Sequence, residues 1–487
     1  MNFRSVIYIL GWILIIEGVM MLSPFAVALI YGEPQGAAFA VMAFVCIVIG
    51  AAIALKKPKR MTFFSREGFA VTALAWILMS VFGCLPFVMN GDIPSFTDAL
   101  FETVSGFTTT GSSILDDIPA LSHASLFWRS LTHWIGGMGV LVFLLALIPM
   151  TGGSHVNIMR AESPGPTVSK LLPKVRQTAF ALYAIYVALT VLEFILLIIG
   201  RMPVFDAITT AVGTAGTGGF GIKADSMASY SPYIQWIVTV FMILFGINFG
   251  VYFLLATRRF KAAAIHEEAR YYILIILGAA AVIMIALLTN NTLPDMAFGD
   301  KIRHVFFQVG SLITTTGFST IDYDTWPQLA LMAMLLLMFI GACAGSTGGG
   351  IKVSRVLILC RSVKNSLTLF FHPKRVVNLR SEGKTVPNEV VQSVSVYIIA
   401  YIIVYVVSMF IISIDGYDFT TNFTAIAATI NNIGPGLSKA GPTESFSLFS
   451  PLSKYVMIFD MLAGRLELYP MLILLTPEFW KSLKPGH

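Results

Sequence analysis

The stretch Asp98-Ala-Leu-Phe-Glu-Thr-Val-Ser-Gly-Phe-Thr-Thr-Thr-Gly111 is half apolar and ends in three threonines and a glycine, and this ending recurs at Thr314–Gly317. In extended backbone, threonine and glycine can turn successive carbonyl oxygens inward, where they replace the hydration shell of a cation such as K⁺. Glycine is needed because such a backbone includes torsions with φ > 0, which a Cβ opposes. The repeated ending is therefore typical of a cation pore loop.

Two more segments align with this stretch. They read Asp206-Ala-Ile-Thr-Thr-Ala-Val-Gly-Thr-Ala-Gly-Thr-Gly-Gly219 and Thr421-Asn-Phe-Thr-Ala-Ile-Ala-Ala-Thr-Ile-Asn-Asn-Ile-Gly434. Each of the four predicts a short helix that ends at a glycine, and about a hundred residues separate successive glycines, which indicates an internal repeat of helix, pore loop and helix. Close helix packing on small residues is the alternative for any one loop, but four loops at a common interval disfavour it.

The composition places these loops in a membrane. Of the 487 residues, 56% are hydrophobic and only 12% are charged, a more apolar balance than that of soluble chains. The apolar run from Val6 to Tyr31 is too long for the core of a signal peptide and predicts a retained transmembrane helix. The four cysteines, Cys46, Cys84, Cys343 and Cys360, have no Cys-x-x-Cys spacing, so neither a disulfide framework nor a zinc site is indicated.

Hydropathy predicts an all-α polytopic membrane protein with about ten transmembrane helices, each near the roughly 20 residues that a bilayer needs. The predicted spans are 5–31, 36–55, 68–90, 124–149, 177–200, 232–256, 270–289, 327–350, 389–414 and 452–476. The outward loops after the third, fifth, seventh and ninth spans contain the four segments, which are too short to span. We therefore expect four re-entrant pore loops.

Basic residues gather in alternate loops and set the orientation. They lie at 56–60, 160–176, 258–261 and 355–384, whereas the opposite loops carry aspartates and few lysines or arginines. Because basic loops resist translocation, the basic loops and both termini are expected to be cytoplasmic.

The predicted loops are suited to cations. A half-helix buried in the membrane points the negative end of its dipole at the pore. Non-helical backbone at this depth is tolerated only where it is buried in protein or lines a wet cavity, and four such segments can meet that condition around one axis. One chain would then supply the whole filter.

The four loops, and the segment Asn431-Asn432-Ile433-Gly434-Pro435-Gly436 above all, resemble those of the Trk/Ktr/HKT superfamily of K⁺ transporters. The resemblance covers the whole chain and is greatest to the membrane subunit of bacterial Trk systems. It implies two leading helices and four helix–pore loop–helix repeats with pseudo-fourfold symmetry. These parts are expected at 1–60, 61–165, 166–265, 266–384 and 385–487.

The resemblance also implies which residues select the ion. A filter glycine in every repeat goes with K⁺ and Rb⁺, whereas serine in the first repeat goes with Na⁺ preference in some plant members, so Gly111 favours K⁺. The fourth loop leaves Gly436 open as an alternative to Gly434. The expected filter residues are Thr109, Thr110, Gly111, Thr217, Gly218, Gly219, Thr315, Thr316, Gly317, Asn432, Ile433 and Gly434.

A glycine-rich segment, 341–352, interrupts the eighth span, because so many glycines and small polar residues break a helix. It is not a P-loop, since it lacks the Gly-Lys-Ser/Thr pair and a preceding strand. By resemblance it is an intramembrane loop beneath the filter that gates the path. The expected gate residues are Gly345, Ser346, Thr347, Gly348, Gly349, Gly350 and Arg465.

Arg465 lies inside the last apolar segment, where a charge is expensive unless it faces a cavity or a partner. The resemblance places its guanidinium near the pore axis, where it would repel K⁺. An ion pair with Glu467 or Asp460 is the structural alternative.

Other intramembrane polar residues allow more than one interpretation. Arg129 and His133 lie four apart on one helical face, which suits a proton relay or, more simply, bonding between helices. A coupling site should recur at symmetric positions in the repeats, and Glu17, Glu193 and Asn248 do not. The sequence contains no paired nucleophile and base and no metal cluster, so we do not expect an enzyme or an organic cofactor.

The segment 371–380 mixes basic and apolar residues and suits anionic lipid headgroups or a docked protein. The resemblance implies a homodimer on a cytoplasmic nucleotide-binding regulatory subunit (TrkA-like) that binds NAD(H) or adenine nucleotides; nucleic acid is not an expected partner. We therefore expect K⁺ uptake across a bacterial inner membrane, channel-like and driven by the membrane potential. An H⁺- or Na⁺-coupled K⁺ symporter that works by alternating access is the alternative.

Overall fold

The computed structural model describes residues 3–55, 58, 65–139, 175–375, 377–381 and 384–481. Most of the basic clusters predicted at 56–60 and 160–176 lie outside these residues, as do residues 140–149 of the predicted span 124–149 and the boundary between repeats 1 and 2.

The described part of the chain is helical apart from one short hairpin of β1 (Arg380–Ser381) and β2 (Lys384–Thr385). Within the described residues, six helices are long and apolar enough to cross a membrane, or seven spans if one bent pair counts as a span. The six are α1 (Phe3–Tyr31), α2 (Gly36–Ala54), α3 (Ser65–Asn90), α8 (Val175–Ile199), α13 (Glu267–Thr289) and α17 (Asn388–Ile412). Large apolar side chains on them are exposed, among them Phe44, Phe180 and Phe410, as expected of a surface that faces lipid.

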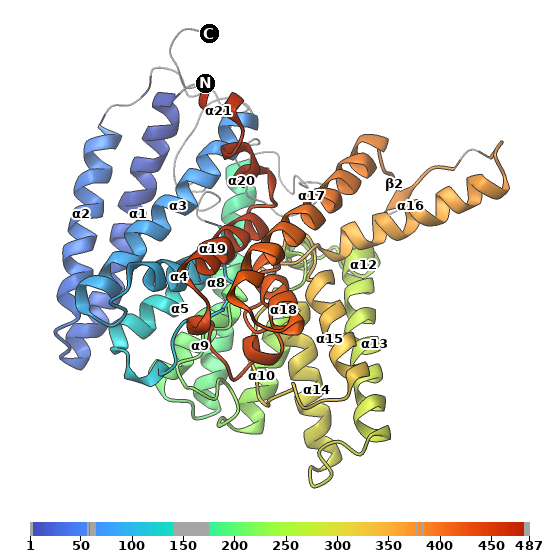
Figure 1. Ribbon diagram of the computed structural model, residues 1–487, viewed down its shortest axis with the longest axis horizontal. Coiled ribbons are helices and arrows are strands. Elements are labelled where there is room, and N and C mark those ends of the chain that lie inside the picture. Colours follow the sequence, from blue (N-terminus) through green and yellow to red (C-terminus); the bar gives the residue numbers. More distant parts are fainter. Residues whose placement is uncertain are drawn as a thin grey trace.

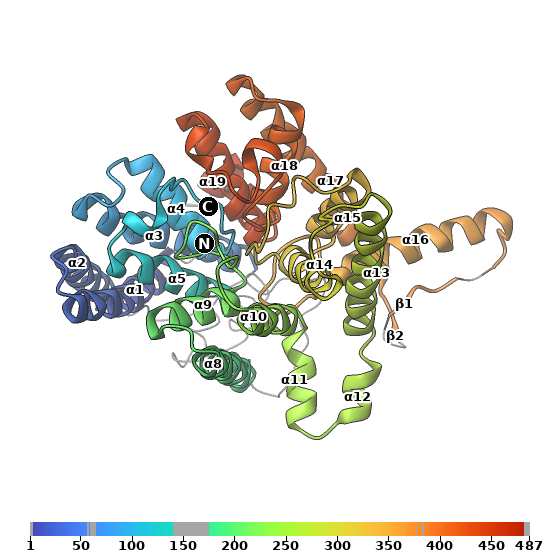
Figure 2. The same ribbon diagram turned by 90° about the horizontal axis from the view of Figure 1, so that it is seen from below.

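Four groups of helices surround a common centre, in the order of the chain, and α1 and α2 pack on the outside of the first group (Figure 2). Each group contains one of the long helices α3, α8, α13 and α17. The short pore helices are α4 (Phe96–Phe107), α9 (Val204–Gly216), α14 (Phe298–Ile313) and α18 (Phe419–Ile430). The second helices are α5 (His123–Met138), α10 (Pro232–Phe245), α15 (Gln328–Ile340) and α19 (Pro451–Arg465).

Small residues bring the two leading helices together. A Cβ on Gly18 would lie 2.8 Å from the carbonyl oxygen of Ala43, and one on Gly50 would lie 2.6 Å from that of Gly11. Close backbone approach on glycine is how helices associate in lipid, where there is no hydrophobic driving force between them.

Serine residues start three of the four second helices. The hydroxyls of Ser122, Ser231 and Ser450 accept hydrogen bonds from the N–H groups three residues later. Proline follows directly at 232 and 451, where a missing N–H has no consequence. The sequence therefore fixes where these helices begin after each loop.

The second helices end early, which corrects two predicted spans. The predicted span 232–256 is two helices, α10 and α11 (Phe249–Ala256), bent by 92°. The side-chain oxygen of Asn248 caps α11 by accepting from the N–H of Gly250 at 2.7 Å. The predicted span 452–476 also breaks: α20 (Tyr469–Leu474) follows α19 after Glu467 and Leu468, which have φ of 63° and 64°.

In the third group the predicted interruption is present. The backbone is non-helical between α15 and α16 (Val353–Phe371), and α16 projects from the body of the molecule (Figure 1). The remaining elements are α12 (Phe260–Ile265), α21 (Pro477–Lys481), η1 (Ile118–Ala120), η2 (Ser413–Asp415), η3 (Ser438–Ala440) and η4 (Phe446–Leu448).

The centre of the molecule is its most completely buried part. Every residue in 101–110, 209–218, 307–316 and 424–434 is buried. These ranges cover the C-terminal halves of the pore helices and the loops that follow, so the four loops meet in the core.

Candidate functional site

All four pore helices end in the same backbone motif. The residue after the last helical turn has φ between 54° and 57° in each case: Thr109, Thr217, Thr315 and Asn432. Its N–H donates to the carbonyl three residues back, and the next N–H donates to the carbonyl five residues back, at 2.8 to 3.0 Å in every loop. This is the Schellman arrangement, which usually requires glycine at the left-handed position.

Threonine at three of these positions is unusual. A β-branched residue with positive φ costs roughly 1–3 kcal/mol, and such strain persists only where the surroundings enforce it. The closely similar φ of Thr109, Thr217, Thr315 and Asn432 therefore indicates that the loop geometry is imposed by contacts among the loops.

The second residue after each strained position is a glycine with positive φ. The values are 82° at Gly111, 75° at Gly219, 89° at Gly317 and 102° at Gly434. Gly436 does not have this conformation; its N–H donates to the carbonyl of Ala440. Of the two candidates in the fourth loop, Gly434 is therefore the one equivalent to the other three glycines.

These glycines close a ring. A Cβ placed on Gly111 would strike the carbonyl oxygen of Gly218 in the second loop, and one on Gly219 would strike that of Thr316 in the third. A Cβ on Gly317 would strike the carbonyl oxygen of Ile433. One on Gly434 would lie 3.0 Å from that of Thr110, which returns to the first loop. Each glycine thus faces the carbonyl that precedes the next glycine around the ring.

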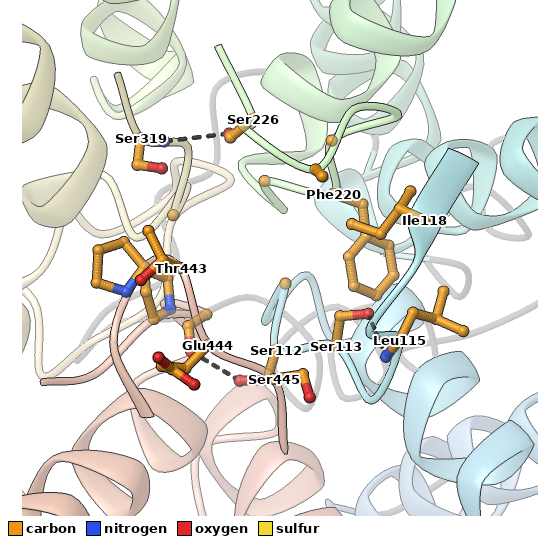
Figure 3. A pocket seen from close by; sticks show the side chains of 18 of the residues that line it. Ser112, Ser113, Leu115, Ile118, Phe220, Ser226, Ser319, Thr443, Glu444 and Ser445 are labelled. Carbon is orange, nitrogen blue, oxygen red and sulfur yellow. Dashed lines mark hydrogen bonds between the residues drawn. The ribbon is translucent and has the colours of Figure 1, made fainter. Parts of the chain in front are cut away.

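A polar cavity of 340 Å³ opens on one side of the ring (Figure 3). All four ring glycines line it, together with five serines and Thr443, the acidic Asp116 and Glu444 and the basic Arg129 and Lys223. Hydrogen bonds join the loops at its edge. Ser112 Oγ donates to the carbonyl of Gly434 at 2.8 Å, and Ser226 Oγ accepts from the N–H of Ser319 at 3.2 Å.

Asn432 links the fourth loop to the first. Its Nδ2 donates to Thr110 Oγ1 and to the carbonyl of Met461, both at 2.9 Å. The Thr110 hydroxyl also lies 2.8 Å from that of Thr108. Asn432 stands where the other three loops have threonine, and its side-chain amide makes two hydrogen bonds that a threonine hydroxyl could not make together.

Arg129 and His133 both bond between elements, as the packing interpretation expects. His133 Nδ1 lies 2.7 Å from the carbonyl of Gly106 in α4, and Nε2 accepts from the N–H of Phe220 in the second loop at 3.2 Å. Arg129 forms an ion pair with Glu102 of α4. Sequence reasoning missed Glu102, and its only signal was an acidic residue in the buried half of the pore helix α4, one turn after Asp98.

The glycine-rich loop lies against the other side of the ring. The N–H of Gly349 donates to Thr315 Oγ1 at 2.6 Å, and the N–H of Gly350 donates to the carbonyl of Asn431 at 3.1 Å. Glu268 of α13 holds both flanks of the loop, since its Oε1 accepts from the N–H groups of Ala344 at 2.7 Å and Ser354 at 3.0 Å.

Arg465 contacts this loop and the first repeat. Its guanidinium donates to the carbonyl of Thr347 at 2.9 Å, to that of Gly137 at 2.7 Å and to that of Gly136. The two carboxylates that the sequence offered as alternative ion-pair partners of Arg465 bond to other residues. Glu467 pairs with Arg355, and Asp460 Oδ1 accepts from Ser408 Oγ at 2.7 Å.

Glu17 and Glu193 are buried in α1 and α8, and Glu193 lies beside Thr214 of the pore helix α9. Asn248 caps α11 and lies beside Gly345 of the glycine-rich loop. Among the described residues no group of three or more His, Cys, Asp or Glu side chains is arranged to hold a metal ion. The sequence-predicted filter and gate residues are thus brought together, the former in the ring and the latter against its side opposite the cavity.

Comparison with known proteins gives the family. The family model described as "TrkH: Cation transport protein" matches residues 35–482. The Trk system potassium uptake protein TrkH of Salmonella typhimurium is 37% identical over 99% of this chain and 100% of its own length. The TrkG protein of Escherichia coli K12 is 33% identical over 98% of this chain and 99% of its own.

A solved structure has the same fold. The crystal structure of the potassium transporter TrkH from Vibrio parahaemolyticus matches with a TM-score of 0.88 and 34% sequence identity, over 99% of this chain and 100% of that one. The all-α membrane fold and the Trk resemblance predicted from the sequence are therefore confirmed. This chain belongs to the TrkH family of cation transport proteins.

Proposed function

We propose that this chain is the membrane subunit of a potassium uptake system and conducts K⁺ through a filter in the ring of loops. The supporting observation is the closed order in which each ring glycine faces the carbonyl that precedes the next one. Four sets of backbone oxygens around one axis can replace the water around K⁺. The filter residues would be Thr109, Thr110, Gly111, Thr217, Gly218, Gly219, Thr315, Thr316, Gly317, Asn432, Ile433 and Gly434.

The surroundings of the ring favour a cation. The pore helices end at the loops, so their negative dipole ends face the ring. The cavity on one side would admit hydrated K⁺ from outside.

The gate would lie on the other side of the ring. There the segment Gly345, Ser346, Thr347, Gly348, Gly349 and Gly350, held by Arg465, would close the path. Opening requires the loop to leave the ring, and the positive guanidinium raises the barrier until it does.

Flux would be channel-like, because the membrane potential alone supplies about 2.3 kcal/mol per charge at 100 mV. The test is uptake of radioactive Rb⁺ into proteoliposomes that contain this chain alone, under an inside-negative voltage with the pH and Na⁺ gradients clamped. Uptake that K⁺ blocks and Na⁺ does not, and that needs voltage only, supports the proposal. Uptake that appears only with an H⁺ or Na⁺ gradient would establish the coupled symporter instead.

The chain would work as a homodimer in a bacterial inner membrane, with both termini cytoplasmic. Its relatives are named as parts of a Trk system, which supports a partner subunit. That partner would be a cytoplasmic nucleotide-binding regulatory subunit (TrkA-like) that binds NAD(H) or adenine nucleotides. The exposed basic residues Lys374 and Arg375 after α16 suit that partner or anionic lipid.

The orientation can be tested on a native thiol. Cys360 of α16 is exposed, whereas Cys46, Cys84 and Cys343 are buried. A membrane-impermeant maleimide should modify the protein in inside-out vesicles and not in intact cells, and Cys360→Ser should abolish the signal. Labelling of intact cells would reverse the proposed topology.

A further inference from the structure

A completely buried ion pair lies directly behind the first loop. Arg129 of α5 donates through Nε to Glu102 Oε1 at 2.8 Å, and its Nη2 lies 2.7 Å from the same oxygen. The two side chains are 1% and 0% exposed. Burial of two charges is expensive, and it is tolerated only where the geometry is good and further hydrogen bonds satisfy both partners.

The further hydrogen bonds hold the backbone just beyond two ring glycines. Glu102 Oε2 accepts from the N–H of Ile114 at 3.0 Å, and Oε1 accepts from Ser113 Oγ at 3.0 Å. On the other side, Arg129 Nη1 donates to the carbonyl of Gly221 at 3.3 Å. The guanidinium also lies 4.2 Å from the ring centre of Phe220. One ion pair therefore fixes the exit of the first loop and the exit of the second.

The contacts continue to the fourth loop. Ser112, next to the fixed Ser113, donates to the carbonyl of Gly434. A continuous set of contacts thus runs from Gly221 through Arg129 and Glu102 to the ring glycine of the fourth repeat.

The other repeats have no such pair at the equivalent positions. The residues nine before the ring glycines are Thr210, Gln308 and Ala425, in place of Glu102. The residues seven after the helix caps are Val238, Met334 and Met457, in place of Arg129. A pair needed only to pack pore helix against second helix would be expected in every repeat, since each builds the same junction.

The geometry points to Glu102 and Arg129 as positioning residues that set the spacing of the filter carbonyls and so determine K⁺ over Na⁺ selectivity. This inference rests on the proposed function. A ring that must hold carbonyl oxygens at the distance of K⁺ needs its backbone fixed by surrounding hydrogen bonds, because oxygens free to move inward can also coordinate the smaller Na⁺. The first, second and fourth loops have that support from this one pair.

Three variants separate positioning from stability. Glu102→Gln keeps the shape, but whichever way the amide is oriented, its NH₂ faces the N–H donors of Arg129 or Ile114. Arg129→Lys keeps the charge and loses the planar fork that reaches Glu102 and Gly221 together. The double variant Glu102→Gln/Arg129→Met leaves no unpaired buried charge, and such neutral replacements usually preserve folding.

The measurement is Rb⁺ uptake into proteoliposomes with K⁺ or Na⁺ as competitor, together with the Tm of each purified variant in detergent. We expect all three variants to lower discrimination of K⁺ from Na⁺, by about tenfold in the double variant, a change in relative binding of the two ions. Among the three variants, Arg129→Lys should lose the least discrimination. Glu33→Gln is the matched control, because Glu33 bonds the start of the same helix α5 away from the ring and should leave the discrimination unchanged.

The outcomes separate the two proposals. Wild-type protein without K⁺-selective uptake would refute the proposed function itself. Selective wild-type protein with an equally selective double variant would overturn the positioning role. Failure of all three variants to fold would also overturn it, because the pair would then serve only stability.

Discussion

The ring of loops is built four times on one plan, whereas the segments on its gate side differ among the second, third and fourth repeats, where the structure describes them. In the ring, four unlike sequences adopt closely similar φ at Thr109, Thr217, Thr315 and Asn432. On the gate side, α10 bends into α11 by 92°, α15 gives way to a glycine-rich loop, and α19 ends at Arg465. Coordination of one spherical ion needs equivalent oxygens on all sides, while closing a path needs only one obstruction. The symmetric part thus suits selection, and the asymmetric part suits the proposed gate.

The largest effect should come from breaking the ring. Gly111→Ala, Gly219→Ala and Gly317→Ala each place a Cβ against a carbonyl of the next loop. We expect K⁺ over Na⁺ discrimination in Rb⁺ uptake to fall at least about tenfold in each. In Gly434→Ala the discrimination should fall less, because the added Cβ would lie 3.0 Å from the nearest oxygen.

Two glycines outside the ring control for torsional strain. Gly91 and Gly416 have φ of 80° and 77°, but a Cβ on either would meet nothing within 4 Å. Gly91→Ala and Gly416→Ala should cost stability of about 1 kcal/mol and leave discrimination intact. Equal loss of discrimination in all six variants would contradict the ring as the source of selectivity.

Variants of the proposed gate should change the rate of Rb⁺ uptake and not its selectivity. Arg465→Ala removes hydrogen bonds to the carbonyls of Thr347, Gly136 and Gly137, so the loop should leave the ring more readily. Loss of even one charge-assisted hydrogen bond corresponds to about tenfold in an equilibrium constant, so we expect Rb⁺ uptake to rise about tenfold. The ratio of K⁺ to Na⁺ competition should stay that of the wild type.

A matched variant removes a cation elsewhere. The exposed Lys439 of η3 lies 5.1 Å from the centre of the aromatic ring of Tyr417, and Lys439→Ala should leave uptake unchanged. Faster uptake in both variants would assign the effect to net charge, and no change in Arg465→Ala would remove this residue from the proposed gate.

A smaller rise in Rb⁺ uptake is expected from substitutions that free the flanks of the glycine-rich loop. Glu268→Ala deletes the acceptor for the N–H groups of Ala344 and Ser354, and Rb⁺ uptake should increase about threefold, because these bonds hold the ends of the loop and not its centre. Glu268→Gln retains an amide oxygen that can accept from both groups, so it should increase uptake less. The reverse order of the two variants would count against this clamp.

The sequence allowed much of the ring to be predicted, because its chemistry is local. A glycine at the end of each short helix is visible in the chain, and so is the glycine-rich interruption before Lys352. The break at Gly246 to Asn248 was missed, since apolar residues continue on both sides and hydropathy does not report a bend. The choice between Gly434 and Gly436 needed the torsions, because both are glycines.

Pairings over long distances could not be predicted. Glu467 is next but one to Arg465 in the chain, yet its positive φ at the helix break accompanies a pairing with Arg355. Glu102 and Arg129 are separated by a loop and a helix cap, so nothing in the sequence states that they meet. Whether the predicted filter and gate residues perform those roles stays a prediction until the variants above are measured.

The smallest effect is expected at Glu33, where a substitution should change the stability of the protein and not the geometry of the ring. Glu33, in the turn between α1 and α2, accepts from the backbone N–H groups of His123 and Ala124 and lies 2.8 Å from His123 Nδ1. Burial alone would raise the pKa of the Glu33 carboxyl, but the hydrogen bonds and the histidine hold it below its usual value. A lowered folded pKa means that the carboxylate stabilises the protein above the unfolded pKa of about 4.3, and that this stabilisation is lost as the pH falls through the folded value. Glu33→Gln should therefore lower Tm by a few degrees at pH 7 and converge with the wild type in acid, while K⁺ over Na⁺ discrimination stays constant. A change in discrimination at pH 7 would mean that the leading helices help to shape the ring, and that the symmetry of the ring depends on more than its four repeats.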